Sequence, residues 1–161
     1  MLERLAALPP DGSRVWYFPG AADRGHADVV ARVQRRDGST WMACLPRPDQ
    51  GLGHDGIFAL PCGERLFIAG GIVDRDRPAD WTALPLRAAR ATWSPDRSVV
   101  VLHDSTSVHV FGQNGPLWSA TLGSDATVAS VTTDMVACDV YDWAAGQPVM
   151  RRFDLHTGQP R

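Results

Sequence analysis

The residues of this chain that could do chemistry are its five histidines and the aspartates beside them. Two His/Asp pairs fall on predicted loops, His26 with Asp28 and His54 with Asp55. A carboxylate that orients an imidazole lets the ring act as a general base or bind a metal ion. Pairs this short are also typical of solvated turns, since Asp before Gly is a turn signal. The turn interpretation is favoured, and the chemical one stays open.

A third group lies in the second half of the chain and consists of His103, Asp104 and His109. A turn predicted at 104–106 would place the two imidazoles on paired strands, where they could meet. Two histidines are part of a metal site, but no third ligand follows from the spacing. His103 and His109 are therefore weak metal candidates, and no metal site is predicted.

Motifs of common enzyme classes are missing from the sequence. It contains no G-x-S-x-G elbow, P-loop, H-E-x-x-H or G-x-G-x-x-G. Glu3 and Glu64 are the only glutamates, so the carboxylate pair of a glycosidase would have to be Asp. Cys44, Cys62 and Cys138 form no C-x-x-C pair, which predicts free and mostly buried thiols. The sequence assigns no catalytic residue and implies no cofactor.

Acidic loops and tryptophans indicate a binding surface instead. Acidic side chains in loops speed the encounter with a basic partner, and an exposed tryptophan can anchor an interface. The expected anchor is whichever of Trp16, Trp81 or Trp143 lies outside the core. The candidate binding residues are Asp49, His54, Asp55, Asp74, Asp76, Asp80 and Trp81.

Composition limits the class of protein. A chain of 161 residues with 44% hydrophobic residues fits one domain with a real core. The formal net charge is −2, and no basic cluster exceeds Arg35-Arg36 or Arg151-Arg152, so nucleic acid is not an expected partner. No apolar run approaches the ~20 residues of a membrane span, and residues 1–12 do not resemble a signal peptide. A cytoplasmic location without membrane contact is the expectation.

The elements that must position these residues are predicted to be short strands. The sequence has no Lys and two Glu, so it lacks the residues that favour exposed helix faces. At most one short helix is expected, over 2–8, where Pro9-Pro10 ends it. Strands separated by turn signals are predicted over 14–18, 28–34, 39–45, 56–60, 65–69, 81–86, 90–93, 98–103, 107–111, 117–122, 126–131, 135–141 and 149–155.

The second half repeats a pattern with a period of about 40 residues. Residues 91–118 and 129–160 each contain a short strand, an Asp-bearing turn, a long strand and a return strand that closes on Phe. Trp93-Ser94-Pro95-Asp96 resembles the entry turn of a WD40-type β-propeller blade, although Arg97 stands where Gly is usual. The stretch FDLHTGQ, from Phe153 to Gln159, resembles the turn that ends blades of quinone-type propellers.

Residues 56–161 also resemble an uncharacterised family of bacterial and plant β proteins. The matching motifs are Gly56-Ile57-Phe58, Ala69-Gly70-Gly71, Leu84-Pro85-Leu86, Gly115-Pro116-Leu117-Trp118 and Asp154 to Gly158. This resemblance implies a β fold and no particular activity.

The predicted fold is all-β, as an antiparallel β-sandwich or a small propeller-like arrangement of blade-like hairpin units. A closed propeller needs at least four blades of about 40 residues, and residues 1–50 do not resemble a blade. The sandwich is therefore favoured. The expected organisation is a single domain over 1–161, with a less regular part at 1–50 and the blade-like hairpins at 56–161.

The predicted function is that of a non-catalytic protein-binding domain. Its concrete form would be a bacterial immunity protein or antitoxin-type inhibitor of a partner toxin or enzyme, which rests on base rates for small acidic domains. The alternative is a small hydrolase or metal-dependent enzyme with a site built from His54, Asp55, His103 and His109. Convergence of those side chains in one pocket would favour the enzyme. A homo-oligomer with paired edge strands stays possible.

Overall fold

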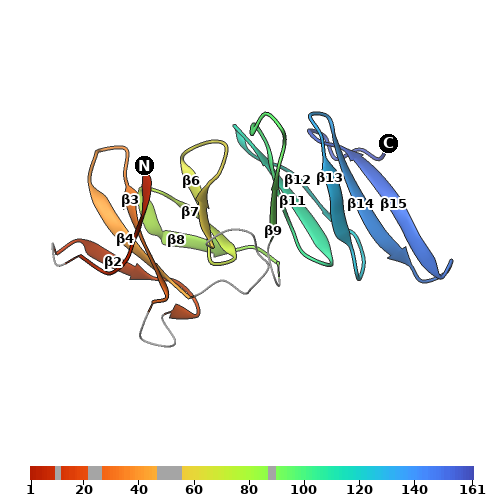
Figure 1. Cartoon of the computed structure of the whole chain (residues 1–161). Coiled ribbons are helices and arrows are strands. Elements are labelled where there is room, and N and C mark those ends of the chain that lie inside the picture. The colour runs from red at the N-terminus through yellow and green to blue at the C-terminus, as the bar shows by residue number, and fades with distance from the viewer. Residues whose placement is uncertain (10–11, 22–26, 47–55, 87–89) are drawn as a thin grey trace. The chain divides into compact units, whose positions relative to one another are not determined.

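The computed structural model describes residues 1–9, 12–21, 27–46, 56–86 and 90–161, and in these the protein is all-β, as predicted (Figure 1). The chain divides into two compact units. Unit 1 comprises Met1–Ala59 with Gly63–Leu84, and unit 2 comprises Leu60–Cys62 with Pro85–Arg161. The described part of the chain contains no helix long and apolar enough to cross a membrane.

Unit 1 contains two four-stranded sheets. Sheet A has the order β1 (Leu2–Leu5), β3 (Val29–Gln34), β4 (Thr40–Leu45) and β2 (Arg14–Tyr17), with β2 parallel to β4 and the other pairs antiparallel. Sheet B is an antiparallel meander of β5 (Ile57–Ala59), β6 (Arg65–Ile68), β7 (Gly71–Asp74) and β8 (Arg77–Ala83).

One hydrophobic core joins sheets A and B. Alternate residues of β3 and β4, such as Val33 and Trp41, pack with Leu66, Ile68 and Val73 of sheet B. The period of two follows from the pleat, which sends successive side chains to opposite faces. The buried indole of Trp41 also donates its N–H to the carbonyl of Arg75 at 2.8 Å. Sheet A and sheet B therefore share the core of unit 1.

Unit 2 repeats this plan with two meanders. Sheet C consists of β9 (Arg90–Trp93), β10 (Val100–His103), β11 (Ser107–Gly112) and β12 (Gly115–Thr121). Sheet D consists of β13 (Thr127–Val131), β14 (Met135–Asp142) and β15 (Gln147–Asp154). Their shared core includes Val101 and Val110 from sheet C and Val136, Cys138 and Val140 from sheet D. Of the four sheets among the described residues, only sheet D has three strands.

Trp118 links sheet C to the turn that follows β15 of sheet D. Its indole N–H donates to the carbonyl of Leu155 at 2.8 Å, and the ring lies against Gly158. A Cβ on Gly158 would come within 2.7 Å of the ring, and the residue has φ +71°, so both space and backbone require glycine. Trp81 uses the same device in unit 1, donating to the carbonyl of Ile68 at 2.9 Å while its ring covers Gly71.

The sequence prediction differs from the structure over residues 2–8 and 71–86. The helix expected over 2–8 is the strand β1, because residues 2–5 pair with the edge of β3 and Glu3 contacts Arg32 across that pair. Pairing and burial override helix propensity in so short a segment. Strand β7 was not predicted, although Gly71 already pairs with Ile68, and β8 begins at Arg77 rather than at residue 81.

The bond from Trp118 can be tested through stability. Trp118→Phe keeps most of the ring but leaves the Leu155 carbonyl without this donor, so we expect the free energy of unfolding to fall by about 1–2 kcal/mol. Urea denaturation followed by circular dichroism measures the change. Trp143→Phe is the matched control, because its indole donates only to an exposed serine, and it should change stability by less than about 0.5 kcal/mol. Equal effects of the two substitutions would contradict the structural role of Trp118.

Candidate functional site

The acidic residues proposed from the sequence form ion pairs within unit 1. The Asp76 carboxylate accepts from both the backbone and the guanidinium of Arg36, which lowers the pKa of Asp76 and raises that of Arg36. Asp74 and Asp80 both contact Arg77, at 3.4 and 3.2 Å. The Arg36–Asp76 contact ties the β3–β4 turn to the β7–β8 turn, and the arginines together offset the acidic charge. They leave no open acidic patch at Asp74, Asp76 and Asp80.

The two histidines expected to meet lie on opposite faces of sheet C. In the β10–β11 register His103 is opposite Val108, and His109 is opposite Leu102. His103 shares a face with Val101, which is in the core of unit 2, and His109 shares the other face with Leu102. The expectation that the imidazoles meet is wrong, because a separation of one register position reverses the face. The described residues contain no group of three His, Cys, Asp or Glu able to hold a metal ion.

His103 is a buried residue of the core. Its Nε2 lies 3.3 Å from the hydroxyl of Thr92, and its cross-strand neighbour is Arg90. Burial, assisted by the charge of Arg90 and opposed by Asp104, lowers the pKa of His103 to about 4. Asp104 accepts from the backbone N–H groups of Thr106 at 2.7 Å and Ser107 at 2.9 Å, which shapes the turn. These contacts stabilise the β10–β11 hairpin, so His103 and Asp104 have a structural role here.

The remaining chemical candidates give no site either. Cys44 and Cys138 are buried, as predicted, and burial raises the pKa of both thiols, that of Cys138 to about 11. A shallow pocket of about 200 Å³ is lined by Met1, Glu3, Arg32, Gln34 and Thr40, without His or Cys. His26, Asp49, His54 and Asp55 lie outside the described residues.

Of the three candidate anchors, Trp143 is the one that does not pack against a core. Trp16 and Trp81 pack against the core of unit 1, whereas 71% of Trp143 is exposed, in the turn between β14 and β15. Its indole donates to the Ser124 hydroxyl at 2.8 Å, and its ring meets Tyr141 edge-on at 4.7 Å.

The turn that carries Trp143 is held by its own hydrogen bonds. The side chain of Asp142 accepts from the backbone of Ala144 at 2.9 Å and of Ala145 at 3.1 Å. The carbonyl of Asp142 accepts from Gly146 at 2.8 Å. An exposed aromatic ring on so well-bonded a turn loses little conformational entropy on binding.

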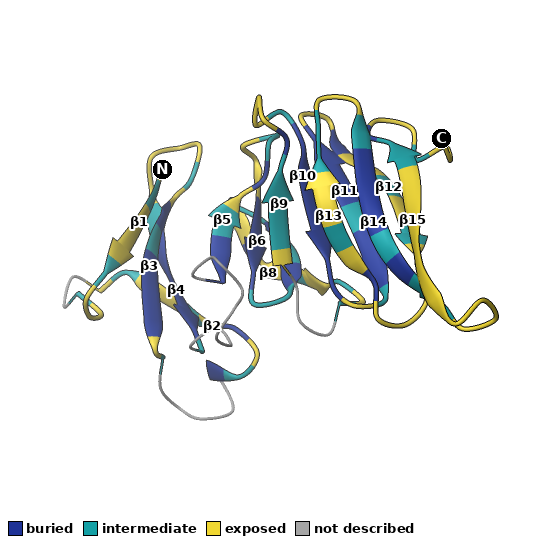
Figure 2. Ribbon diagram, turned by 45° about the vertical axis from the view of Figure 1, so that its right-hand side comes forward, coloured by how far each residue is buried: buried dark blue, intermediate teal, exposed yellow. Residues whose placement is uncertain are grey.

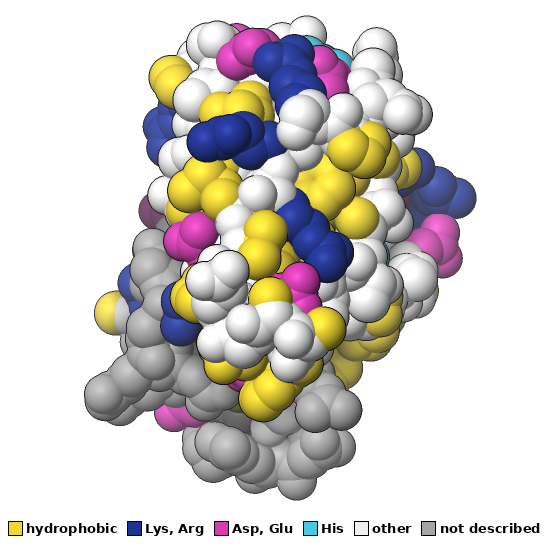
Figure 3. Space-filling view, turned by 90° about the vertical axis from the view of Figure 1, so that its right-hand side faces the viewer, with side chains coloured by type: hydrophobic (Ala, Val, Ile, Leu, Met, Phe, Trp, Pro, Cys, Tyr) yellow, Lys and Arg dark blue, Asp and Glu magenta, His cyan; other side chains and the backbone are white. Residues whose placement is uncertain are grey.

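The face of sheet D turned away from sheet C continues the surface around Trp143. In the β14–β15 register Tyr141 lies opposite Pro148, and Asp139 lies opposite Met150, so these side chains share the outer face. Met150 is 49% exposed. Figure 3 views the molecule from this side and shows hydrophobic side chains interspersed with basic ones. We call Tyr141, Trp143, Pro148 and Met150 the outer patch.

Strand β15 carries two residues of the outer patch, Pro148 and Met150, and is an edge strand of sheet D. Residues 147–152 are all exposed (Figure 2). Among the described residues, its open edge is paired only at the C-terminal end, by residues 159–161, which fold back antiparallel to β15. The N–H of Asp154 donates to the carbonyl of Gln159 at 2.8 Å, and that of Arg161 donates to the carbonyl of Arg152 at 2.9 Å.

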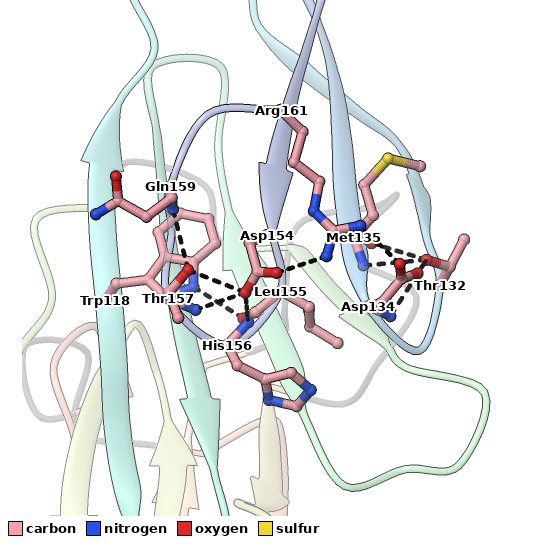
Figure 4. A network of polar contacts seen from close by, with 10 residues as sticks. All are labelled: Trp118, Thr132, Asp134, Met135, Asp154, Leu155, His156, Thr157, Gln159 and Arg161. Atoms are coloured by element: carbon pink, nitrogen blue, oxygen red, sulfur yellow. Dashed lines mark hydrogen bonds and ion pairs between the residues drawn. The ribbon is translucent and has the colours of Figure 1, made fainter.

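An ion-pair network fixes this folded-back tail (Figure 4). The guanidinium of Arg161 donates to Asp154 and to Asp134, each at 2.6 Å. Asp154 also accepts from the backbone and hydroxyl of Thr157, and these contacts, that of Arg161 foremost, hold its pKa well below the ordinary range. The tail therefore has a defined position beside β15.

Sequence reasoning missed most of this surface. It named Trp143 as one of three possible anchors but attached no role to β15. The usable signals were Pro148, which is tolerated in edge strands, and the adjacent pair Arg151-Arg152, which was weighed only as a nucleic-acid footprint. Compared with known proteins, the chain matches no family model, no curated sequence and no solved structure.

The buried imidazole of His103 predicts a dependence of stability on pH. The pKa is about 4 in the folded chain and about 6.5 when unfolded, so the unfolded state binds a proton first as the pH falls. The contribution of His103 to the free energy of unfolding is complete above pH 6.5. It is lost as the pH falls toward 4, by at most about 3 kcal/mol.

Urea denaturation at several pH values measures this slope. His103→Gln should reduce the slope between pH 6.5 and 4, whereas the control His156→Gln, at an exposed turn position, should leave it unchanged. An unaltered slope in His103→Gln would show that other groups cause the acid sensitivity.

Proposed function

We propose that this protein is a non-catalytic protein-binding domain that contacts its partner through the outer patch of sheet D. The observation that carries the proposal is Trp143, a large aromatic side chain that is 71% exposed. It is held in place by a hydrogen bond to Ser124 and an edge-on contact with the ring of Tyr141. Tryptophan and tyrosine are enriched among the residues that dominate binding energy. Monomeric proteins seldom leave such side chains exposed together without a use for them.

The neighbours of Trp143 support a protein partner rather than a small molecule. Pro148 and Met150 extend the apolar surface along β15, and Arg152 lies on the same face as a polar border. An apolar centre with a polar rim is the usual anatomy of a protein interface. The patch lies on a sheet face and a turn, whereas small-molecule sites are concave.

The enzyme alternative has less support among the described residues. Of its four proposed residues, His103 is in the core and His109 is on the opposite face of the sheet. Inhibition of a partner toxin or enzyme, in the manner of an immunity protein, remains our concrete form of the binding proposal. It is supported by the small size of the domain and its bonded, exposed anchor, since a rigid surface suits tight inhibition.

The proposal predicts that a bound protein depends on Trp143. The tagged full chain and its variants are used to capture proteins from the lysate of the native host, and quantitative mass spectrometry compares them. We expect a stoichiometric protein with the wild type that falls at least about tenfold with Trp143→Ala. Tyr17→Ala, which removes an exposed aromatic residue from unit 1, is the matched control and should retain the protein.

Urea denaturation must show that Trp143→Ala is as stable as the wild type, since the side chain is exposed. Equal capture by the wild type and by Trp143→Ala would contradict the assignment of the anchor. Recovery of the bait alone would contradict protein binding in that lysate.

A further inference from the structure

We propose that β15 takes up an extended, acidic segment of the partner as an additional antiparallel strand, which makes sheet D four-stranded. The inference rests on the proposed function and specifies how the partner is held. Its basis is the open edge of β15, the tail already paired with one end of that edge, and two arginines beside it that form no ion pair with the described acidic residues. Strand addition to a sheet edge is a recurrent way of binding extended peptides.

The register shows which backbone groups face the open edge. Bonds from the tail reach the carbonyl of Arg152 and the N–H of Asp154, so the backbone groups of these two residues point away from β14. In an antiparallel ladder this orientation alternates, and the β14–β15 pairing continues without a shift. The backbone groups of Met150 and Pro148 therefore also point to the open edge. Met150 offers a donor and an acceptor there, and Pro148 offers an acceptor.

Residues 159–161 begin a fourth strand of the sheet. Phe153 and Pro160 form an antiparallel bridge, and the N–H of Arg161 bonds to the carbonyl of Arg152. A segment that follows the same line would pair next with Arg151, Met150 and Val149. Sheets A, B and C already have four strands each, so an added strand gives sheet D the size that the other sheets have.

The positive charge of β15 favours an acidic segment as the added strand. Arg151 and Arg152 are exposed, and neither has an ion pair with an acidic residue in the described part of the chain. They point to opposite faces of the sheet, so a carboxylate on an added strand could reach the arginine that lies directly across from it and on its own face. The aliphatic side chains of Val149 and Met150 flank them, and these favour apolar residues at the following positions.

A second copy of this chain is a poor occupant of the same edge. Two antiparallel β15 strands would bring their arginines together, and Pro148 would leave a donor missing in each strand. Proline and basic residues are devices by which edge strands avoid pairing with themselves. These features discourage self-association and still permit an acidic strand that uses the groups of Met150.

The test uses the full chain labelled with ¹⁵N and a short blocked peptide that begins Glu-Val-Val. In the proposed register Glu lies opposite Arg151, and the two Val lie opposite Met150 and Val149. We expect a Kd of about 10⁻⁴ M by NMR titration and slower amide exchange at Met150 in the complex. A peptide that begins Lys-Val-Val is the charge control and should bind at least about tenfold more weakly.

Two variants at one position separate strand addition from surface contact. Met150→Pro removes the outward N–H without removing a bond to β14, just as Pro148 does, and should weaken the Glu-Val-Val peptide at least about tenfold. Met150→Ala keeps the N–H and should lose far less affinity. Circular dichroism and urea denaturation check that both variants fold.

The outcomes distinguish this inference from the proposed function. Equal binding of the peptide to Met150→Pro and Met150→Ala, or no binding at millimolar concentration, overturns strand addition. If Trp143→Ala still loses the captured protein in that case, protein binding at the outer patch stands without strand addition. If the peptide binds as described but Trp143→Ala captures normally, strand addition stands and the anchor is elsewhere.

Discussion

The hydrogen bond from Trp118 to the carbonyl of Leu155, with the ring lying against Gly158, is the constraint on which the surface of unit 2 depends. It joins the last strand of sheet C to the turn that follows β15. Because the ring occupies the space that a Cβ would need, the turn closes in one way. The closed turn directs residues 159–161 back along β15, where Arg161 joins Asp134 and Asp154. The covered and open parts of the edge follow from this one contact.

The described titratable groups show why binding, rather than chemistry, is the proposed use of the molecule. His103 and Cys138 are buried, and Asp76 is paired with an arginine. Their pKa values move in the directions that burial and ion pairing impose, and those directions make the thiol and the imidazole less reactive or less easily charged. The outer patch, by contrast, is made of apolar and aromatic side chains, which suits recognition.

The sequence predicted the fold class because strand patterning is local. The alternation of Val and polar residues and the Asp-bearing turns were sufficient to place strands in sheets C and D. Contacts between strands that are not adjacent in the sequence were not predictable in this way. Residues 2–5 have helix-forming composition but meet the edge of β3. Sheet A joins sheet B through Trp41 and the Arg36–Asp76 contact. Such contacts depend on tertiary proximity, which composition does not contain.

The candidate site was predictable only in part, for the same reason. Of the three aspartates expected on loops, only Asp76 lies in a turn, since Asp74 ends β7 and Asp80 lies within β8. Arginines distant in sequence or three residues away reach their carboxylates. Trp143 was indistinguishable by sequence from Trp81, since both stand beside an aspartate at a predicted strand end. The difference arises from what lies opposite each ring, which is Gly71 for Trp81 and solvent for most of Trp143.

Amide hydrogen exchange along β15 in the unbound protein tests the central claim most directly. The account predicts slow exchange at Val149 and Arg151, whose N–H groups point to β14, and fast exchange at Met150, whose N–H points to the open edge. Alternating protection of this kind would establish that β15 is hydrogen-bonded to β14 along one edge and has no partner strand along the other. Protection of Met150 equal to that of its neighbours would contradict the account, because the edge would then already be covered.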